Sequence, residues 1–141
     1  MKTTKILVQK SETGLSEDNK AKLKSLEIYK DKKHFKFSNG WVDLSYELGK
    51  NIEEVCKLAN CELPKIEAMY NKYNSLRVDY NFTSPVPKIV ETLIDSLIYV
   101  TEDKSEMICE YCGKSCDIEI TEKNNNYINA CEKCFDRKKR D

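Results

Sequence analysis

Two pairs of cysteines near the C-terminal end of the chain have the spacing of metal ligands. Two residues separate Cys109 from Cys112 and Cys131 from Cys134, and eighteen residues lie between the pairs. A two-residue spacer lets the chain fold back so that both sulfurs face one point, and Gly113 supplies the open backbone angle that the turn needs. Four sulfurs complete the tetrahedral shell of Zn²⁺ and leave no position for water, so we expect one structural, non-catalytic zinc ion.

The segment between the two pairs predicts a β-hairpin. Residues 117–121 alternate apolar and polar side chains, Asn124–Asn126 is typical of a turn, and residues 127–130 predict a returning strand. A hairpin whose ends bring two cysteine pairs together resembles the zinc-ribbon proteins. The resemblance rests on the four cysteines and Gly113 and covers about residues 107–136. It implies a small, rigid, metal-stabilised module.

Three further cysteines have simpler interpretations. Cys116 is a substitute ligand, a reactive thiol or a spare residue at the start of the hairpin, and the last of these is favoured. Cys56 and Cys61 lie in a segment with helical periodicity and are expected to be small core residues. Free buried thiols or a redox pair explain the doubled Cys-x-x-Cys spacing less well than a metal does.

The N-terminal third predicts a short strand over residues 5–9, a helix over 17–25 capped by Ser16, and β structure over 26–45. Asn39-Gly40 favours a hairpin turn within that last stretch. The alternative is a helix from Trp41 to Leu48, capped by Ser38 or Asn39.

Residues 51–75 predict two helices, the first capped by Asn51 and ended by a left-handed turn at Asn60. This segment resembles the helix-turn-helix pattern, which implies that the second helix would enter the DNA major groove. Glu62 and Glu67 would then face phosphates, so an ordinary helical hairpin is the favoured interpretation. The resemblance is carried by Val55, Cys56, Ala59, Asn60, Cys61, Leu63, Ile66 and Met69.

An amphipathic helix is predicted over residues 88–100, followed by a polar hinge over 101–106. Its apolar stripe is wide enough to be buried against the body or a partner, so an acidic substitution at Leu93 or Leu97 should unfold the chain or break an assembly. The stripe comprises Ile89, Val90, Leu93, Ile94, Leu97 and Ile98. We therefore expect an α+β domain over residues 1–103 and a zinc ribbon with a basic tail over 104–141.

Charge argues against a protein that binds nucleic acid mainly through phosphates. Lys and Arg number 24, as do Asp and Glu, and four thiolates with one Zn²⁺ bring the formal charge from zero to −2. Residues 1–50 carry +4, residues 51–105 carry −3, and the rest carry −1 before metal. A phosphate binder normally has a basic excess. The basic run at 137–140 is expected to be a solubilising tail.

No catalytic set is evident. His34 lies in a lysine-rich stretch without a neighbouring nucleophile motif, and the chain has four glycines and no phosphate-binding loop. We therefore expect a protein that is not an enzyme. Neither a secretory signal nor a run of 18 apolar residues is evident, so we also expect it to be cytosolic and not membrane-bound.

These observations favour a small zinc-binding regulatory or adaptor protein of α+β class. Its partner is expected to be a protein, as for the small inhibitors that phages encode, with Tyr70, Tyr73 or Trp41 as apolar anchors. The alternative is a DNA-binding regulator that uses the segment at 51–75. Nothing in the sequence indicates a small-molecule substrate.

Overall fold

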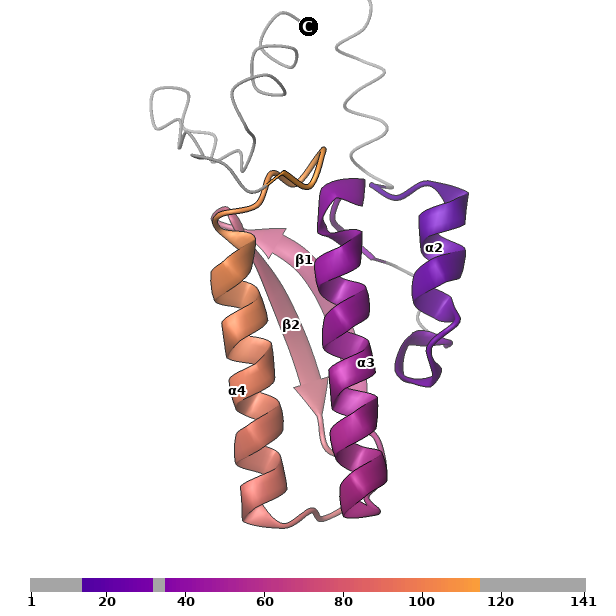
Figure 1. Cartoon of the computed structure of the whole chain (residues 1–141), viewed down its shortest axis with the longest axis vertical. Coiled ribbons are helices and arrows are strands. Elements are labelled where there is room, and N and C mark those ends of the chain that lie inside the picture. The colour runs from indigo at the N-terminus through magenta and orange to yellow at the C-terminus, as the bar shows by residue number, and fades with distance from the viewer. Residues whose placement is uncertain (1–13, 32–34, 115–141) are drawn as a thin grey trace, which may run out of the picture.

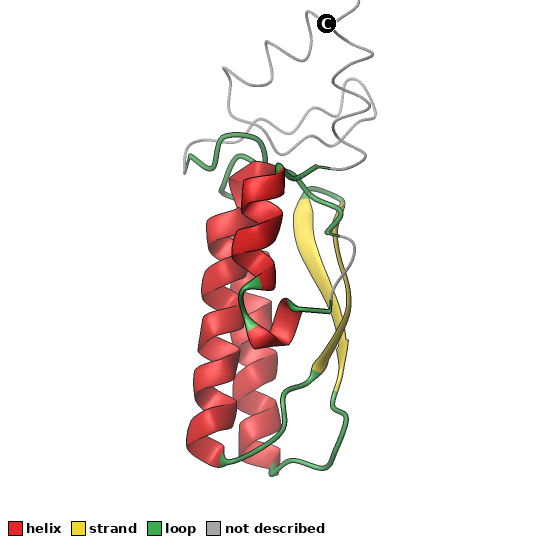
Figure 2. Ribbon diagram, turned by 90° about the vertical axis from the view of Figure 1, so that its right-hand side faces the viewer, coloured by secondary structure: helices red, strands yellow, loops and turns green. Residues whose placement is uncertain are grey.

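The described part of the chain forms two layers, with helices on one face of a β-hairpin. The computed structural model describes residues 14–31 and 35–114. Helices α3 and α4 run antiparallel beside each other, and Figure 2 shows the hairpin on one side of them. This mixture agrees with the α+β class. The elements in order are α2 (Glu17–Lys24), η1 (Glu27–Tyr29), η2 (Asn39–Trp41), α3 (Val42–Ala59), β1 (Lys65–Lys72), β2 (Ser75–Asn81) and α4 (Lys88–Ser105).

Two of the predicted helix ends are confirmed in this part of the chain. Ser16 caps α2 as predicted, with its hydroxyl accepting a hydrogen bond from the Asn19 amide at 3.2 Å. Asn60 ends α3 in the left-handed conformation, at φ 58° and ψ 45°, also as predicted. The strand expected over residues 5–9 lies outside the described residues. None of the helices in the described part of the chain combines the length and the apolar character of a membrane span.

The β structure predicted over residues 26–45, with a hairpin at Asn39-Gly40, is wrong for the described residues, which form η1, η2 and the start of α3. The alternative helix is confirmed, but neither Ser38 nor Asn39 caps it. Asn39 and Gly40 belong to the 3₁₀ turn η2, and α3 begins directly after it at Val42. The same helix continues through Asn51, which is therefore not a helix cap. The Asn39 side chain instead accepts hydrogen bonds from the Ser16 amide and the Asn19 side chain, both at 2.9 Å.

The second helix of the helix-turn-helix-like pair is also wrong, because residues 65–72 form strand β1. The strand carries a β-bulge between Ile66 and Ala68 in its pairing with β2. In a regular strand, residues three apart point to opposite faces, but the extra residue of a bulge shifts the alternation by one. Ile66 and Met69 are therefore both buried, and their three-residue spacing imitates a helix.

Both edges of the hairpin are covered within the described residues. Beside β1, Lys36 donates its amide to the Met69 carbonyl at 2.9 Å and accepts from the Asn71 amide at 3.2 Å. Beside β2, two side chains of α4 accept hydrogen bonds from strand amides: the Ser105 hydroxyl from the Leu76 amide at 2.7 Å, and the Glu102 carboxylate from the Val78 amide at 3.0 Å.

The polar hinge expected at 101–106 is largely the last turn of α4, and the domain boundary expected at 103/104 falls inside this helix. Burial raises the pKa of Glu102.

The core is built around a row of aromatic rings. Successive ring centroids are 5.7, 6.0 and 6.3 Å apart along Tyr29, Phe35, Phe37 and Trp41. The Tyr29 hydroxyl donates to the Ser45 carbonyl at 2.7 Å inside the core, and burial raises the pKa of this phenol. Cys56 is buried, as expected of a small core residue, and burial raises the pKa of its thiol.

The predicted helix at 88–100 is confirmed and extends to Ser105, but only half of its apolar stripe is buried. Val90, Ile94 and Ile98 belong to the core, whereas Ile89 and Leu93, about 100° of helical rotation away from their buried neighbours, are exposed on the flank of the helix. The stripe is therefore two faces, one packed against the body and one open to solvent.

This division predicts opposite outcomes for two neighbouring substitutions. Ile94→Asp buries an unpaired charge, so it should lower the free energy of unfolding by more than about 3 kcal/mol or prevent folding. Leu93→Asp places its charge in solvent and should cost less than about 1 kcal/mol. Urea denaturation at low protein concentration measures both values, and equal losses would contradict the assignment of the two faces.

Candidate functional site

The first cysteine pair forms a closed loop whose backbone points at a sulfur atom. We call residues 109–114 the knuckle. Its ends are joined by hydrogen bonds from the Gly113 amide to the Cys109 carbonyl and from the Cys109 amide to the Lys114 carbonyl, both at 2.9 Å. The amides of Tyr111 and Cys112 point to the Cys109 sulfur at 3.4 and 3.5 Å. Converging amides stabilise negative charge, which is what a metal-binding thiolate needs.

Gly113 closes this loop with a left-handed backbone. Its φ is +81°, a conformation that side-chain-bearing residues rarely adopt. A Cβ at this position would also lie 3.2 Å from the Gly40 carbonyl oxygen. The sequence-based expectation that Gly113 serves the turn is confirmed.

The knuckle is held directly against the body by the η2 turn. The Gly40 amide donates to the Glu110 carbonyl at 2.6 Å, and the Trp41 indole donates to the Ile108 carbonyl at 3.0 Å. A Cβ on Gly40 would lie 2.2 Å from the Cys109 carbonyl oxygen, which no side chain could accommodate. Gly40 is therefore required for this close approach of two backbones rather than for a hairpin turn.

A buried carboxylate fastens the knuckle to two further segments. Glu110 lies between the two cysteines in the sequence and is only 6% exposed. Its oxygens accept from the Ser38 amide at 3.1 Å and from the Asn71 side-chain amide at 2.6 Å. Buried carboxylates are stable only when such donors surround them. The first half of the predicted metal site is thus part of the packed body.

The structure describes two of the four predicted zinc ligands, Cys109 and Cys112, and brings both onto one loop. The predicted ligands Cys131 and Cys134 lie outside the described residues, as do Cys116 and the hairpin expected between the pairs. Within residues 14–31 and 35–114, no three potential metal ligands gather. The amides directed at the Cys109 sulfur fit a tetrathiolate zinc site, in which Cys131 and Cys134 would supply the other half.

Sequence reasoning missed the residues that position the knuckle. Nothing in the spacing of Glu110 marks a buried carboxylate, because most glutamates lie in solvent. Asn39-Gly40 was recognisable in the sequence as a special backbone position, but a glycine suits a tight turn and a close approach of two backbone segments equally well.

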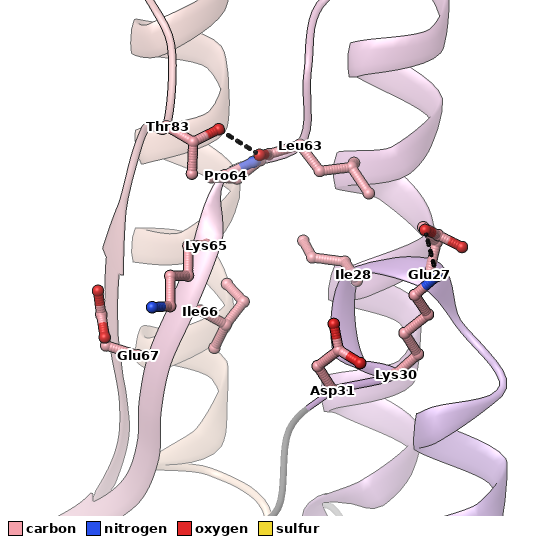
Figure 3. A pocket seen from close by; sticks show the side chains of 10 residues that line it. All are labelled: Glu27, Ile28, Lys30, Asp31, Leu63, Pro64, Lys65, Ile66, Glu67 and Thr83. Carbon is pink, nitrogen blue, oxygen red and sulfur yellow. Dashed lines mark hydrogen bonds and ion pairs between the residues drawn. The ribbon is translucent and has the colours of Figure 1, made fainter.

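A separate pocket of about 530 Å³ lies between η1 and the start of β1. Figure 3 shows charged side chains from both elements around it, with Glu27 and Lys30 forming an ion pair at 2.9 Å. The lining mixes acids with lysines and contains neither cysteine nor histidine. This mixture does not assemble a nucleophile with a base, and His34 lies outside the described residues.

Comparisons of the chain with protein-family models, with curated proteins and with solved structures give no match. The functional argument therefore rests on the knuckle and on the surfaces around it.

The metal assignment predicts about one zinc ion per purified chain. Substituting Cys131 or Cys134 by Ser should release the ion, because three ligands hold Zn²⁺ far less tightly than four. Cys116→Ser is the matched control and should leave the zinc content unchanged. Elemental analysis of protein prepared under reducing conditions and without chelator checks this. Absence of zinc from the unsubstituted chain would overturn the site, and its loss from Cys116→Ser would show that the fourth ligand is misassigned.

The second prediction concerns the buried carboxylate. Glu110→Ala leaves the Ser38 amide and the Asn71 side-chain amide without their acceptor, which should cost about 2–4 kcal/mol in the free energy of unfolding. The exposed Glu106, four residues earlier, is the control, and Glu106→Ala should change this value by less than about 0.5 kcal/mol. Urea denaturation of the zinc-loaded proteins compares them. A harmless Glu110→Ala would mean that the knuckle is not anchored through this group.

Proposed function

We propose that this chain is a cytoplasmic zinc-binding regulatory or adaptor protein, without enzymatic activity, that binds a protein partner at the end of the molecule carrying the knuckle. One Zn²⁺ ion is held structurally by Cys109, Cys112, Cys131 and Cys134. The metal makes the loop rigid, and Glu110 fixes the orientation of the loop relative to the body. A surface fixed in this way loses little conformational freedom on binding, which favours affinity.

The observation that carries this proposal is a pair of large exposed side chains at the end of the fold to which the knuckle is attached. Tyr73, in the β1–β2 turn, is 73% exposed, and Met107, just after α4, is 56% exposed. Both lie at the end of the fold where α4 finishes and β1 turns into β2 (Figure 1). Tyrosine and methionine are enriched at the centres of protein interfaces. We call Tyr73, Met107, Cys112 and Gly113 the knuckle end.

Tyr73 is the strongest anchor among the three aromatic residues that the sequence suggested. Trp41 has 0% exposure and donates to the Ile108 carbonyl, so it is a core residue. Tyr70 is partly buried and its hydroxyl donates to the Asp79 carboxylate at 3.2 Å. Tyr73 lies in a turn and has a left-handed backbone, at φ 53°. The Lys72 Nζ atom lies 5.5 Å from the centroid of its ring.

The DNA-binding alternative loses its basis. The helix expected to enter the major groove is strand β1. The exposed residues of the hairpin alternate in sign, with Lys65 and Glu67 on one strand and Arg77 and Asp79 on the other. A surface that binds phosphates through charge needs an excess of basic residues.

The proposal predicts that removing one aromatic ring will cost more than reversing a charge. The partner is first identified by pull-down from the source cell, analysed for protein and for nucleic acid, and then purified. Tyr73→Ala should weaken binding to the purified partner at least about tenfold, because a central anchor is lost. Leu58→Ala, an equally exposed apolar residue at the far end of α3, should have no effect. Isothermal titration calorimetry at two salt concentrations measures both, and a shallow salt dependence is expected.

Sub-micromolar, steeply salt-dependent binding to duplex DNA would overturn the proposal. So would a partner whose affinity is unchanged by Tyr73→Ala.

A further inference from the structure

The outward face of α4 carries an uncharged seam. Ile89, Leu93, Ser96 and Val100 follow one another at spacings of four, three and four residues, which places them on one line along a helix. All four are exposed, Ile89 to 75% and Leu93 and Val100 each to 47%. Helix α4 buries its other face against the core through Val90, Ile94 and Ile98. The seam lies roughly a third of a turn around α4 from that buried face and is open to solvent, and about a third of the whole chain is charged while these four residues are not.

We infer that this seam binds a second copy of the chain, with the two α4 helices antiparallel about a two-fold axis at Ser96. A two-fold interface must be complementary to itself. Ser96 is the smallest residue of the seam and lets two helices approach closely at the axis. Leu93 lies three residues before it and Val100 four residues after it, so each packs against the other residue type of the partner helix.

Charges at the two ends of α4 select the antiparallel arrangement. Lys88 lies eight residues before Ser96, or about 12 Å along the axis, and Asp103 lies seven residues after it, or about 10 Å. In an antiparallel pair, Asp103 of each copy therefore lies at the height of Ile89 of the other and within reach of the neighbouring Lys88 at the edge of the seam, and this contact occurs twice. A parallel pair would place like charges together and would also align the helix dipoles. Both Lys88 and Asp103 are exposed.

The size of the seam determines the affinity that we expect for the dimer. One helix face with three large apolar residues is smaller than a standard protein interface, so the dimer should dissociate in the micromolar range. Sedimentation velocity of the full zinc-loaded chain over roughly 1 to 100 µM should show a concentration-dependent monomer–dimer equilibrium.

The first test places a charge at the proposed axis. Ser96→Glu brings two carboxylates together and should weaken the dimer at least about 100-fold. Because Ser96 is exposed, the circular dichroism spectrum should not change. Ala21→Glu is the matched control, since Ala21 is also exposed and lies within α2, which is on the other side of α3 from α4 (Figure 1). Its dimer should match that of the unsubstituted chain.

The second test exchanges the end charges. Lys88→Glu and Asp103→Lys should each weaken the dimer about tenfold, and combining them in one chain should restore it, as only antiparallel pairing requires. Neither change opposes the helix dipole, because an acid enters the first turn and a base the last.

A chain that stays monomeric throughout this range, whether because its own terminal residues or a different partner cover the seam, would overturn the inference. A dimer that survives Ser96→Glu, or one that the double exchange does not restore, would do the same. None of these measurements depends on the knuckle-end partner, so the two proposals fail separately.

Discussion

The carboxylate of Glu110 is the group on which the arrangement of the molecule depends. It joins three segments that are far apart in the sequence: the η2 turn through the Ser38 amide, strand β1 through the Asn71 side chain, and the knuckle itself. Burying a charge is costly unless donors replace the lost water. These donors are available only when the three segments are in place together, so the carboxylate strongly favours one arrangement. Glycine at position 40 is the steric condition for this contact.

The predictable parts of the fold were those decided within a few residues. The knuckle follows from Cys-x-x-Cys-Gly, the end of α3 from the left-handed tolerance of Asn60, and the start of α2 from the Ser16 cap. Helix α4 follows from its periodicity, although a periodic stripe does not say which of its residues face the body. Ile89 and Ile94 look alike in the sequence, yet only Ile94 is buried.

The wrong predictions of secondary structure share one physical cause. In each case, a contact with residues far away in the sequence decided the local structure. Asn39-Gly40 forms a turn against Glu110, seventy residues later, and not a hairpin. Ile66 and Met69 have helical spacing because a bulge re-aligns the strand on which they lie, and the bulge depends on pairing with β2. The sequence placed Cys109 and Cys112 on one loop because they are three residues apart. It did not identify Glu110, which holds this loop on the body, because the donors to its carboxylate come from distant segments.

The two proposed surfaces are compatible because one lies along α4 and the other lies beyond its C-terminal end. The knuckle end begins where α4 finishes, whereas the proposed axis at Ser96 lies near the middle of α4. Met107 is eleven residues beyond Ser96, a separation of about 16 Å along a helix. An antiparallel pair would therefore place its two knuckle ends on opposite ends of the dimer, roughly 30 Å or more apart. Each would remain open to its own partner molecule, and a ligand with two linked copies of the recognised surface would bind more tightly than one copy.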